Sequence, residues 1–152
     1  MTVYVVRHAR AGRRSAWKGP DVLRPLTKAG RRQAEALVEL LAGEGVTRIV
    51  SSPYVRCRQT VEPLAQRLRV PVDLSDSLAE GSPLRAVLRL VEKVSDEQAV
   101  LCGHGDEIGA LLEHLREHRV QVDGDKYEKG SVWALDVRAG TIVGARYFAP
   151  PA

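Results

Sequence analysis

The sequence predicts an α/β fold, a single domain in which a mostly parallel, mixed sheet lies between two layers of helices as a three-layer sandwich. Apolar segments of strand length alternate with segments of helical periodicity, which is typical of a parallel sheet covered on both faces. Two further apolar segments near the C-terminus are separated by three residues, which predicts an antiparallel hairpin. With 152 residues, the chain is long enough to bury a complete hydrophobic core.

The first strand is expected to end at the Arg7-His8 pair, because an apolar run precedes it. A polar loop of about 17 residues then extends through Pro25, and loops of that length in compact domains usually serve a function. Thr27 can cap a helix that ends at Gly43, since apolar residues between them recur three and four positions apart. The Arg-His pair is therefore expected at the carboxyl edge of the sheet, where open α/β sheets bind their ligands.

The next segment is expected to form a strand, a helix and another strand. Thr47–Ser51 and Val70–Leu74 are short apolar runs of strand length. Between them, Ser52 and Pro53 are typical of an N-cap followed by a first-turn proline. Pro63 lies inside this helix and should kink it.

The second half of the chain continues the alternation and ends in the hairpin. In chain order, we expect a helix capped by Ser82-Pro83, a strand at Ala99–Cys102, a helix with an apolar stripe from Ile108 to Leu115, and two strands at Val132–Val137 and Thr141–Phe148. No internal repeat, low-complexity tract or interdomain linker interrupts this pattern.

Composition argues against membrane and secreted classes of protein. No apolar run approaches the roughly 20 residues of a membrane span, and the N-terminus lacks the layout of a secretory signal peptide. We therefore expect a cytoplasmic protein. The two cysteines, Cys57 and Cys102, lack metal-ligand spacing, which favours reduced thiols in structural positions.

Positive charge is concentrated at the N-terminus. The net charge of the chain is +4, but residues 1–32 carry nine basic side chains and one acidic side chain, a local charge of +8. Nucleic acid can bind to such a segment, but no recognisable nucleic-acid module is present. The charge therefore predicts a phosphorylated substrate.

Four of the expected strands are each followed by residues that can bind or transfer a phosphoryl group. Arg7 and His8 follow the first strand, Arg56 comes shortly after the second, Glu80 follows the third and His104 follows the fourth. Because the carboxyl ends of parallel strands meet at one edge of a sheet, we expect these side chains to converge. The set predicts a phosphoryl-transfer site.

Each of these groups suits one part of that chemistry. A neutral imidazole at His8 can attack phosphorus through one nitrogen while a backbone carbonyl accepts a hydrogen bond from the other. Arg7 and Arg56 offer permanently charged, planar donors for phosphate oxygens. His104, next to Gly105 at the start of a helix, adds a further donor. Since basic side chains supply the positive charge, no metal or other cofactor is expected.

These motifs together resemble the signature of the histidine phosphatase superfamily, and the resemblance extends over essentially the whole chain. The short length and the Arg24-Pro25-Leu26-Thr27 segment are most similar to SixA-type phosphohistidine phosphatases and to the phosphatase domain fused to some Nudix hydrolases. A histidine phosphatase domain over residues 1–152, with a phosphoglycerate mutase-like fold, is the implied organisation. The matching motifs, in order, are Arg7-His8, Ser52-Pro53-x-x-Arg56 with Gln59-Thr60, Glu80 and Gly103-His104.

The resemblance implies that His8 becomes phosphorylated during the reaction and that Arg7, Arg56 and His104 form the phosphate pocket. Glu80 matches the proton donor of larger family members. The implied substrate is phosphohistidine on a protein, with small phosphate esters or nucleotides as the alternative. The alternative to an enzyme is a module that binds phosphate without turning over a substrate.

Three arginines of the long polar loop, Arg13, Arg14 and Arg24, are expected to contact the substrate. The expected partner is thus a phosphorylated protein or a small phosphate ester. No nucleic acid, membrane or obligate protein partner is expected.

Two motifs imitate other kinds of site. Gly103-His104-Gly105-x-x-x-Gly109 imitates a dinucleotide fingerprint, but it lies in the fourth strand-helix unit, not the first. The segment 114–118 has the His-x-x-Glu-His spacing of inverted zinc proteases. At about 100° per residue, its glutamate points away from the apolar stripe of the helix, which favours a solvated face.

Three assignments stay open at this point. Arg58 is the alternative to Arg56 as the phosphate-binding arginine of its helix. Glu80 precedes Gly81-Ser82 and could be a polar turn residue. Residues 126–130 form either an exposed loop or a cap over the substrate.

Overall fold

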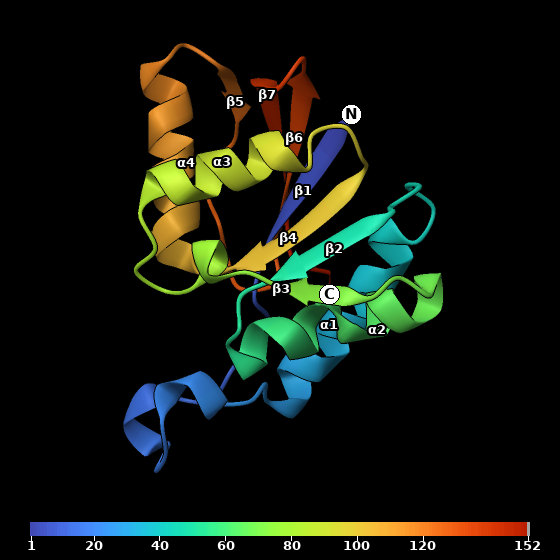
Figure 1. Cartoon of the computed structure of the whole chain (residues 1–152). Helices are drawn as coiled ribbons and strands as arrows, with labels where there is room; N and C mark the ends of the chain where they lie inside the picture. Colours follow the sequence, from blue (N-terminus) through green and yellow to red (C-terminus); the bar gives the residue numbers. More distant parts are fainter. Residues whose placement is uncertain (152) are drawn as a thin grey trace.

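The computed structural model describes residues 1–151 and confirms the three-layer α/β sandwich (Figure 1). A seven-stranded sheet has the strand order β3-β2-β4-β1-β6-β7-β5. Four of its strand pairings are parallel, and the pairings of β6 with β1 and β7 are antiparallel. The strands are β1 (Thr2–Arg7), β2 (Arg48–Ser51), β3 (Val72–Leu74), β4 (Ala99–Gly103), β5 (Gln121–Asp123), β6 (Val132–Arg138) and β7 (Thr141–Phe148).

Four α-helices cover the two faces of the sheet, two on each side (Figure 1). The apolar stripes of α1 and α2 pack on one face and those of α3 and α4 on the other. The helices are α1 (Lys28–Leu41), α2 (Val55–Leu68), α3 (Leu84–Lys93) and α4 (Gly105–Glu117).

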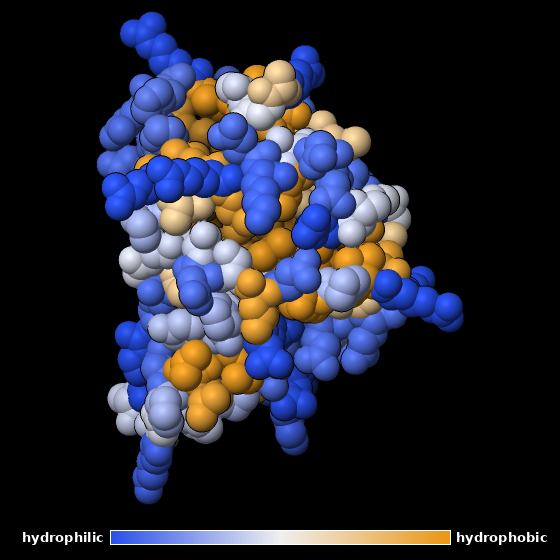
Figure 2. All heavy atoms as spheres, in the orientation of Figure 1, coloured by the Kyte–Doolittle hydropathy of each residue, from blue (hydrophilic) through white to orange (hydrophobic). Residues whose placement is uncertain are grey.

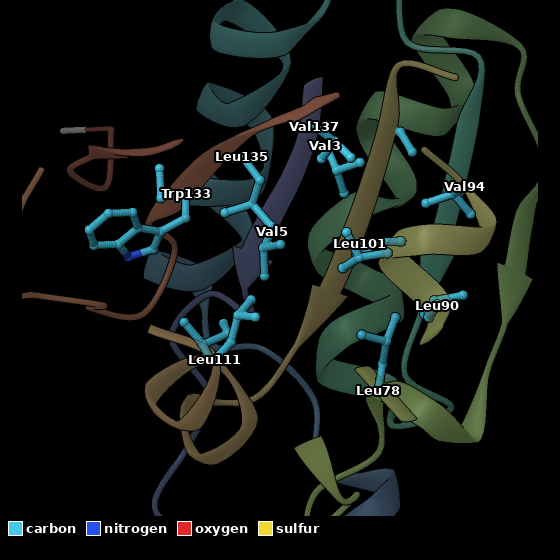
Figure 3. Close-up of a cluster of buried hydrophobic side chains, with 14 of the residues drawn as sticks. Val3, Val5, Leu78, Leu90, Val94, Leu101, Leu111, Trp133, Leu135 and Val137 are labelled. Atoms are coloured by element: carbon cyan, nitrogen blue, oxygen red, sulfur yellow. The ribbon is translucent and has the colours of Figure 1, made fainter. Parts of the chain in front are cut away.

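The central strand β1 contributes to the hydrophobic core on both faces of the sheet. Val3 and Val5 pack with α3 and α4, in the cluster drawn in Figure 3, whereas Tyr4 and Val6 pack with α1 and α2. Side chains alternate between the faces of a strand, so a strand covered on both sides must be apolar at successive positions. This burial explains the uninterrupted apolar run before Arg7.

The strand register brings three chain segments to the same edge of the sheet. Arg7 at the end of β1 pairs with Gly103 at the end of β4, and Ser51 at the end of β2 pairs with Cys102. The residues that follow these strands therefore begin at neighbouring points. As predicted, the carboxyl edge gathers the chemically active motifs.

Two of the four predicted helix starts are wrong, and those of α1 and α4 are confirmed. Thr27 caps α1 as predicted, since its Oγ1 accepts a hydrogen bond from Gly30 N at 3.1 Å. However, α2 begins only at Val55, because Tyr54 still has extended backbone angles. The N-cap of α3 is Pro83 itself, one residue after the predicted Ser82. In both cases the serine-proline pair belongs to the loop before the helix.

The six predicted strands are present, with some boundaries displaced by one or two residues: β2 begins at Arg48 and not at Thr47, and β3 begins at Val72 and not at Val70. The strand β5 was not predicted, because its three residues are too few to show a period in the sequence. The hairpin of β6 and β7 is confirmed. Its turn residues Ala139 and Gly140 have φ angles of 51° and 79°, the left-handed region that two-residue hairpin turns require.

The loop after β1 contains two short 3₁₀ helices, Arg14–Ala16 and Asp21–Leu23. It forms the lower end of the molecule in Figure 1, where Figure 2 shows hydrophobic atoms at the surface. Trp17, Val22 and Leu23 in this loop are 38%, 37% and 52% exposed. No helix of residues 1–151 is long and apolar enough to span a membrane.

Candidate active site

A cleft of about 510 Å³ opens at the carboxyl edge of β1 and β4. Residues from β1, the long loop after it, α2, the segment before α3, the start of α4 and the segment before β6 line this cleft. The structure brings together all eight site residues expected from the sequence: Arg7, His8, Arg13, Arg14, Arg24, Arg56, Glu80 and His104.

His8 lies at the base of the cleft and is 5% exposed. Its Nδ1 is 2.8 Å from the carbonyl oxygen of Ala9, so the N–H at Nδ1 donates to that carbonyl and Nε2 keeps its lone pair. Burial, and then the charges of the surrounding basic groups, lower the pKa of His8 to about 3. The imidazole is therefore neutral at neutral pH and has a fixed tautomer.

Arg56 is held in the first turns of α2 with only 1% of its side chain exposed. Its Nη1 donates to the backbone carbonyl of Asp21 at 3.0 Å, and its Nη2 lies 3.1 Å from Asp21 Oδ2 and 3.4 Å from Glu80 Oε2. The guanidinium also stacks 4.8 Å from the ring centre of Tyr54. Arg58, by contrast, is exposed and does not line the cleft.

Arg7 is fixed at the end of β1 by two contacts. Its Nη1 donates to the carbonyl of Tyr127 at 2.9 Å. Its guanidinium also lies flat against the start of α4, where a Cβ on Gly105 would be 2.8 Å from Arg7 Cζ. Only glycine leaves room for the guanidinium at that position.

His104 is the N-cap residue of α4 and is 2% exposed. Its Nε2 lies 2.9 Å from Ser52 Oγ and 3.5 Å from Cys57 Sγ. Its ring meets that of His8 edge to face, with the centres 5.5 Å apart. Ser52, expected from the sequence to cap α2, instead orients the imidazole of His104.

Three buried donor nitrogens of these residues have no hydrogen-bond partner within residues 1–151: Arg7 Nε, Arg56 Nε and His104 Nδ1. Native proteins satisfy the great majority of their buried polar groups. Since all three residues line the cleft, their side chains are suited to bind an oxyanion there.

The three loop arginines occupy different positions. Arg24 is 7% exposed, donates to Asp21 Oδ1 at 2.9 Å and also donates to the carbonyl of Gly12. Arg14 lies 2.8 Å from Glu80 Oε1. Arg13 is exposed at the rim and forms no salt bridge within the described residues. Arg24 thus anchors the loop, Arg14 holds Glu80, and Arg13 is available to a ligand.

Glu80 lies both in a turn and in the cleft. It precedes Gly81, whose φ of 84° forms the turn before α3. Its carboxylate nevertheless lies in the cleft, ion-paired with both Arg14 and Arg56, and is 34% exposed. The side chain therefore belongs to the site as well as to the turn.

Sequence reasoning did not identify two residues that shape the site, Asp21 and Glu107, and it left the 126–130 segment open as an exposed loop or a cap over the substrate. Asp21 pairs with Arg14, Arg24 and Arg56, and it was visible only as the single acid in a basic segment. Lys129 lines the cleft from the 126–130 segment, as does Tyr127.

Glu107 is the second residue that sequence reasoning did not identify. It lies on the first turn of α4 and is 3% exposed, and its Oε1 accepts a hydrogen bond from His104 N at 2.9 Å. Apolar residues of β1, β4 and α3 surround it. Burial, reinforced by neighbouring Asp106, raises the pKa of Glu107 to about 9. A neutral carboxylic acid thus supports the loop that carries His104.

The His-x-x-Glu-His segment of α4 lies apart from the cleft. The rings of His114 and His118 pack together with their centres 4.1 Å apart, and His118 lies at the C-terminal end of the helix. Within residues 1–151, no three His, Cys, Asp or Glu side chains are grouped so that they could hold a metal ion.

Comparison with known families agrees with the resemblance seen in the sequence. The family model of the histidine phosphatase superfamily (branch 1) matches residues 3–82, more than half of the chain. That segment includes Arg7, His8, Arg56 and Glu80. The chain belongs to the histidine phosphatase superfamily.

Individual relatives of this histidine phosphatase superfamily member extend the match to its full length. An 8-oxo-(d)GTP phosphatase of Mycolicibacterium smegmatis is 42% identical over 163 aligned positions, which include 99% of this chain. Because the alignment covers 48% of that protein, the chain spans about half the length of the curated relative that it matches.

Solved structures show the same fold. The protein histidine phosphatase SixA, in a complex with tungstate, has a TM-score of 0.78 at 18% identity, with 100% of this chain and 97% of that chain covered. A mycobacterial glucosyl-3-phosphoglycerate phosphatase in complex with VO3 has a TM-score of 0.73 at 16% identity, with 99% of each chain covered.

Replacing Glu107 with glutamine should flatten the dependence of stability on pH. A folded-state pKa of about 9 lies above the unfolded value near 4.5, so the folded state keeps a proton that the unfolded state releases. The stability of the wild-type protein should therefore fall as the pH rises from about 4.5 to about 9. Glutamine cannot ionise, so this contribution disappears in Glu107→Gln.

Thermal unfolding of both proteins between pH 5 and pH 9 measures the effect. The difference in Tm should shift in favour of Glu107→Gln as the pH rises. Glu113→Gln, on the exposed face of the same helix, serves as the matched control and should keep the wild-type slope. Equal slopes in wild type and Glu107→Gln would show that Glu107 is already ionised in the folded protein.

Proposed function

We propose that this protein is a phosphatase that transfers a phosphoryl group to Nε2 of His8 and then hydrolyses the phosphohistidine. The observation that carries the proposal is the neutral imidazole of His8, which is held in one tautomer. It lies in a cleft that also contains the guanidinium groups of Arg7 and Arg56. A module that only bound phosphate would need the cations but not a neutral nucleophile among them.

The reaction has two displacement steps. In the first, the lone pair on Nε2 of His8 forms a bond to phosphorus as the bond between phosphorus and the leaving-group oxygen breaks. In the second, the oxygen of a water molecule attacks phosphorus and the phosphorus-nitrogen bond breaks. The products are inorganic phosphate and neutral His8, and the water supplies the proton that the leaving group takes up overall.

Arg7, Arg56 and His104 are proposed to stabilise the charge on the equatorial oxygens in both steps. Their unpartnered nitrogens, described above, are the donors for these oxygens. They are fixed before substrate binds, because Tyr127, Asp21 and Ser52 hold the same side chains through other atoms. Donors that need no reorganisation contribute most to transition-state stabilisation.

Glu80 is proposed to handle the proton of the leaving group. Paired with Arg14 and Arg56, its carboxylate is an acceptor, which suits removal of a proton from the attacking water. Donation to a leaving group requires that Glu80 be protonated first. A phosphoryl group bound to Arg56 would compete with Glu80 for that guanidinium.

Replacing Glu80 with glutamine should therefore affect substrates unequally. An alkoxide needs a proton as it leaves, and loss of a general acid costs roughly 10²–10⁴-fold in rate. Nitrophenolate needs far less help, and the protonated imidazole of phosphohistidine leaves as a neutral group. Glu80→Gln should slow alkyl phosphates by that factor and spare aryl phosphates and phosphohistidine.

Steady-state kinetics with all three substrates measure the difference, and Glu128→Gln, an exposed glutamate outside the cleft, is the control. Equal slowing of all three would assign Glu80 a positioning role through Arg14 and Arg56. Unchanged rates on all three substrates would show that Glu80 serves only as a polar residue of the turn before α3.

Two relatives suggest two substrate classes. The likeness in fold to SixA over the whole chain supports phosphohistidine on a protein as the substrate. The 42% identity to an 8-oxo-(d)GTP phosphatase supports a nucleotide instead. Rates on a phosphohistidine peptide and on nucleoside mono-, di- and triphosphates, compared at equal concentration, decide between them.

The proposal of phosphatase activity is tested by turnover of para-nitrophenyl phosphate in the presence of a chelator. Turnover that depends on His8 is the expected result. Binding of vanadate or phosphate without turnover of any substrate in the panel would identify a phosphate-binding module.

A further inference from the structure

The cleft contains more positive charge than one phosphoryl group neutralises. A phosphoryl dianion brings about two negative charges near pH 7. The residues that line the cleft, together with Asp21 behind it, include six cations and three carboxylates, so one positive charge is left over once a dianion binds. The cations are Arg7, Arg13, Arg14, Arg24, Arg56 and Lys129, and the carboxylates are Asp21, Glu80 and Asp106.

The surplus charge can be assigned to particular side chains. Arg7 offers its unpartnered Nε to the phosphoryl group. Within residues 1–151, Arg13 and Lys129 form no salt bridge although both line the cleft. The remaining cations pair with Asp21 or Glu80; they are Arg14, Arg24 and Arg56.

Lys129 is held beside the nucleophile by its backbone. The N–H of Gly130, the next residue, lies 3.1 Å from the carbonyl oxygens of both Arg7 and His8. The carbonyl of Lys129 accepts a hydrogen bond from Gln33 Nε2 at 3.2 Å. Partial burial, and then four surrounding arginines, lower the pKa of Lys129. Lys129 is therefore repelled by the positive charges of these arginines, and a bound anion would reduce that repulsion.

Arg13 reaches the cleft from a loop that is equally well anchored. The carbonyl of Gly12, the preceding residue, accepts a hydrogen bond from the guanidinium of Arg24. Arg24 is itself buried and paired with Asp21. The backbone at Arg13 is therefore fixed, and its side chain can meet a ligand at the rim with little loss of backbone freedom.

We propose that Arg13 and Lys129 form a second anion-binding subsite next to the phosphoryl site. The substrate then carries a second anionic group, a phosphate or a carboxylate, close to the phosphoryl group that is transferred. This inference rests on the proposed function, since the first anion is the phosphoryl group bound near His8. The cleft volume of about 510 Å³ lies within the roughly 300–1,000 Å³ of small-molecule sites.

Three phosphonates test the subsite, because their carbon-phosphorus bonds resist hydrolysis. Methylphosphonate has one anionic group, phosphonoacetate adds a carboxylate, and methylenediphosphonate adds a second phosphonate. Affinities are measured by isothermal titration calorimetry at constant ionic strength. At least one of the two probes that carry a second anionic group should bind the wild-type protein about tenfold more tightly than methylphosphonate. A tenfold gain is the effect expected of one partly screened hydrogen bond to a charged group. The carboxylate and phosphonate probes also tell which group the subsite prefers.

The variant Arg13→Ala/Lys129→Met should bring the ratio of the two-group to the one-group affinity down to about one, while methylphosphonate still binds through Arg7 and Arg56. Lys126→Met, a lysine of the same segment that does not line the cleft, is the matched control and should behave as wild type. Circular dichroism verifies that each variant is folded.

Two results would overturn the subsite: equal affinity of the wild-type protein for all three probes, or an advantage that survives in the double variant. Failure of the proposed function gives a different result. In that case the wild-type protein would not turn over para-nitrophenyl phosphate, whatever its affinities for the three probes.

Discussion

His8→Ala should reduce turnover of every phosphorylated substrate by at least about four orders of magnitude, the scale on which loss of a catalytic nucleophile acts. The reason is geometric. Nε2 of His8 has its lone pair directed away from the bond between Nδ1 and the Ala9 carbonyl, and the neighbouring imidazole of His104 is already engaged with Ser52. His8 is therefore the imidazole of the cleft whose tautomer is fixed by a backbone carbonyl and whose other nitrogen has no partner.

The phosphorylated intermediate gives a second measurement of the same role. Brief reaction with a ³²P-labelled substrate, followed by denaturation in base, should leave label on the peptide that contains His8, since a phosphorus-nitrogen bond hydrolyses in acid. His118→Ala, an exposed histidine at the end of α4, should keep full activity. Label on His104, or an active His8→Ala protein, would contradict the assignment.

Arg56→Ala should lower kcat/KM roughly 30- to 1,000-fold. This corresponds to a loss of about 2–4 kcal/mol of transition-state binding, which is the effect of removing one preorganised donor. The guanidinium is 1% exposed, so its interaction with a phosphoryl oxygen is little screened by water. Arg56→Lys should recover part of the loss, because an ammonium keeps the charge but not the planar arrangement of donors.

Arg58→Ala is the matched control for Arg56, since it removes the same charge from the exposed side of the same helix. Its kcat/KM should equal that of the wild type. Competition by vanadate should weaken in Arg56→Ala and stay unchanged in Arg58→Ala. Loss of activity in Arg58→Ala with full activity in Arg56→Ala would reverse the choice between the two arginines.

The sequence predicts the fold because the relevant information is local and periodic. Apolar residues at successive positions of β1 and β4, and at helical spacing in α1 to α4, indicate which segments are buried on two faces and which on one. Once the strands are parallel, residues at their carboxyl ends must meet. That rule brings Arg7, His8 and His104 to one edge. It does not choose between Arg56 and Arg58, and the structure shows that only Arg56 lines the cleft.

Contacts between distant segments could not be predicted in the same way. Ser52 looks like a helix cap in the sequence, and only its distance of 2.9 Å to His104 shows another use. Glu107 resembles any helical glutamate until burial against β1 and β4 raises its pKa. Lys129 enters the cleft because Gly130 bonds to the end of β1, a contact that spans more than 120 residues.

The pairing of β1 also sets the order in which the molecule can be made. This strand lies at the centre of the sheet, between β4 and β6, so both of its partners are synthesised long after it. At roughly 5–20 residues per second, β6 follows β1 out of the ribosome after an interval on the order of ten seconds. Until β4 is made the apolar run Val3–Val6 has no partner strand on either edge, and until β6 is made one edge stays open. Catalytic competence is therefore acquired only after β6 has been made, when the segment before it closes over the end of β1.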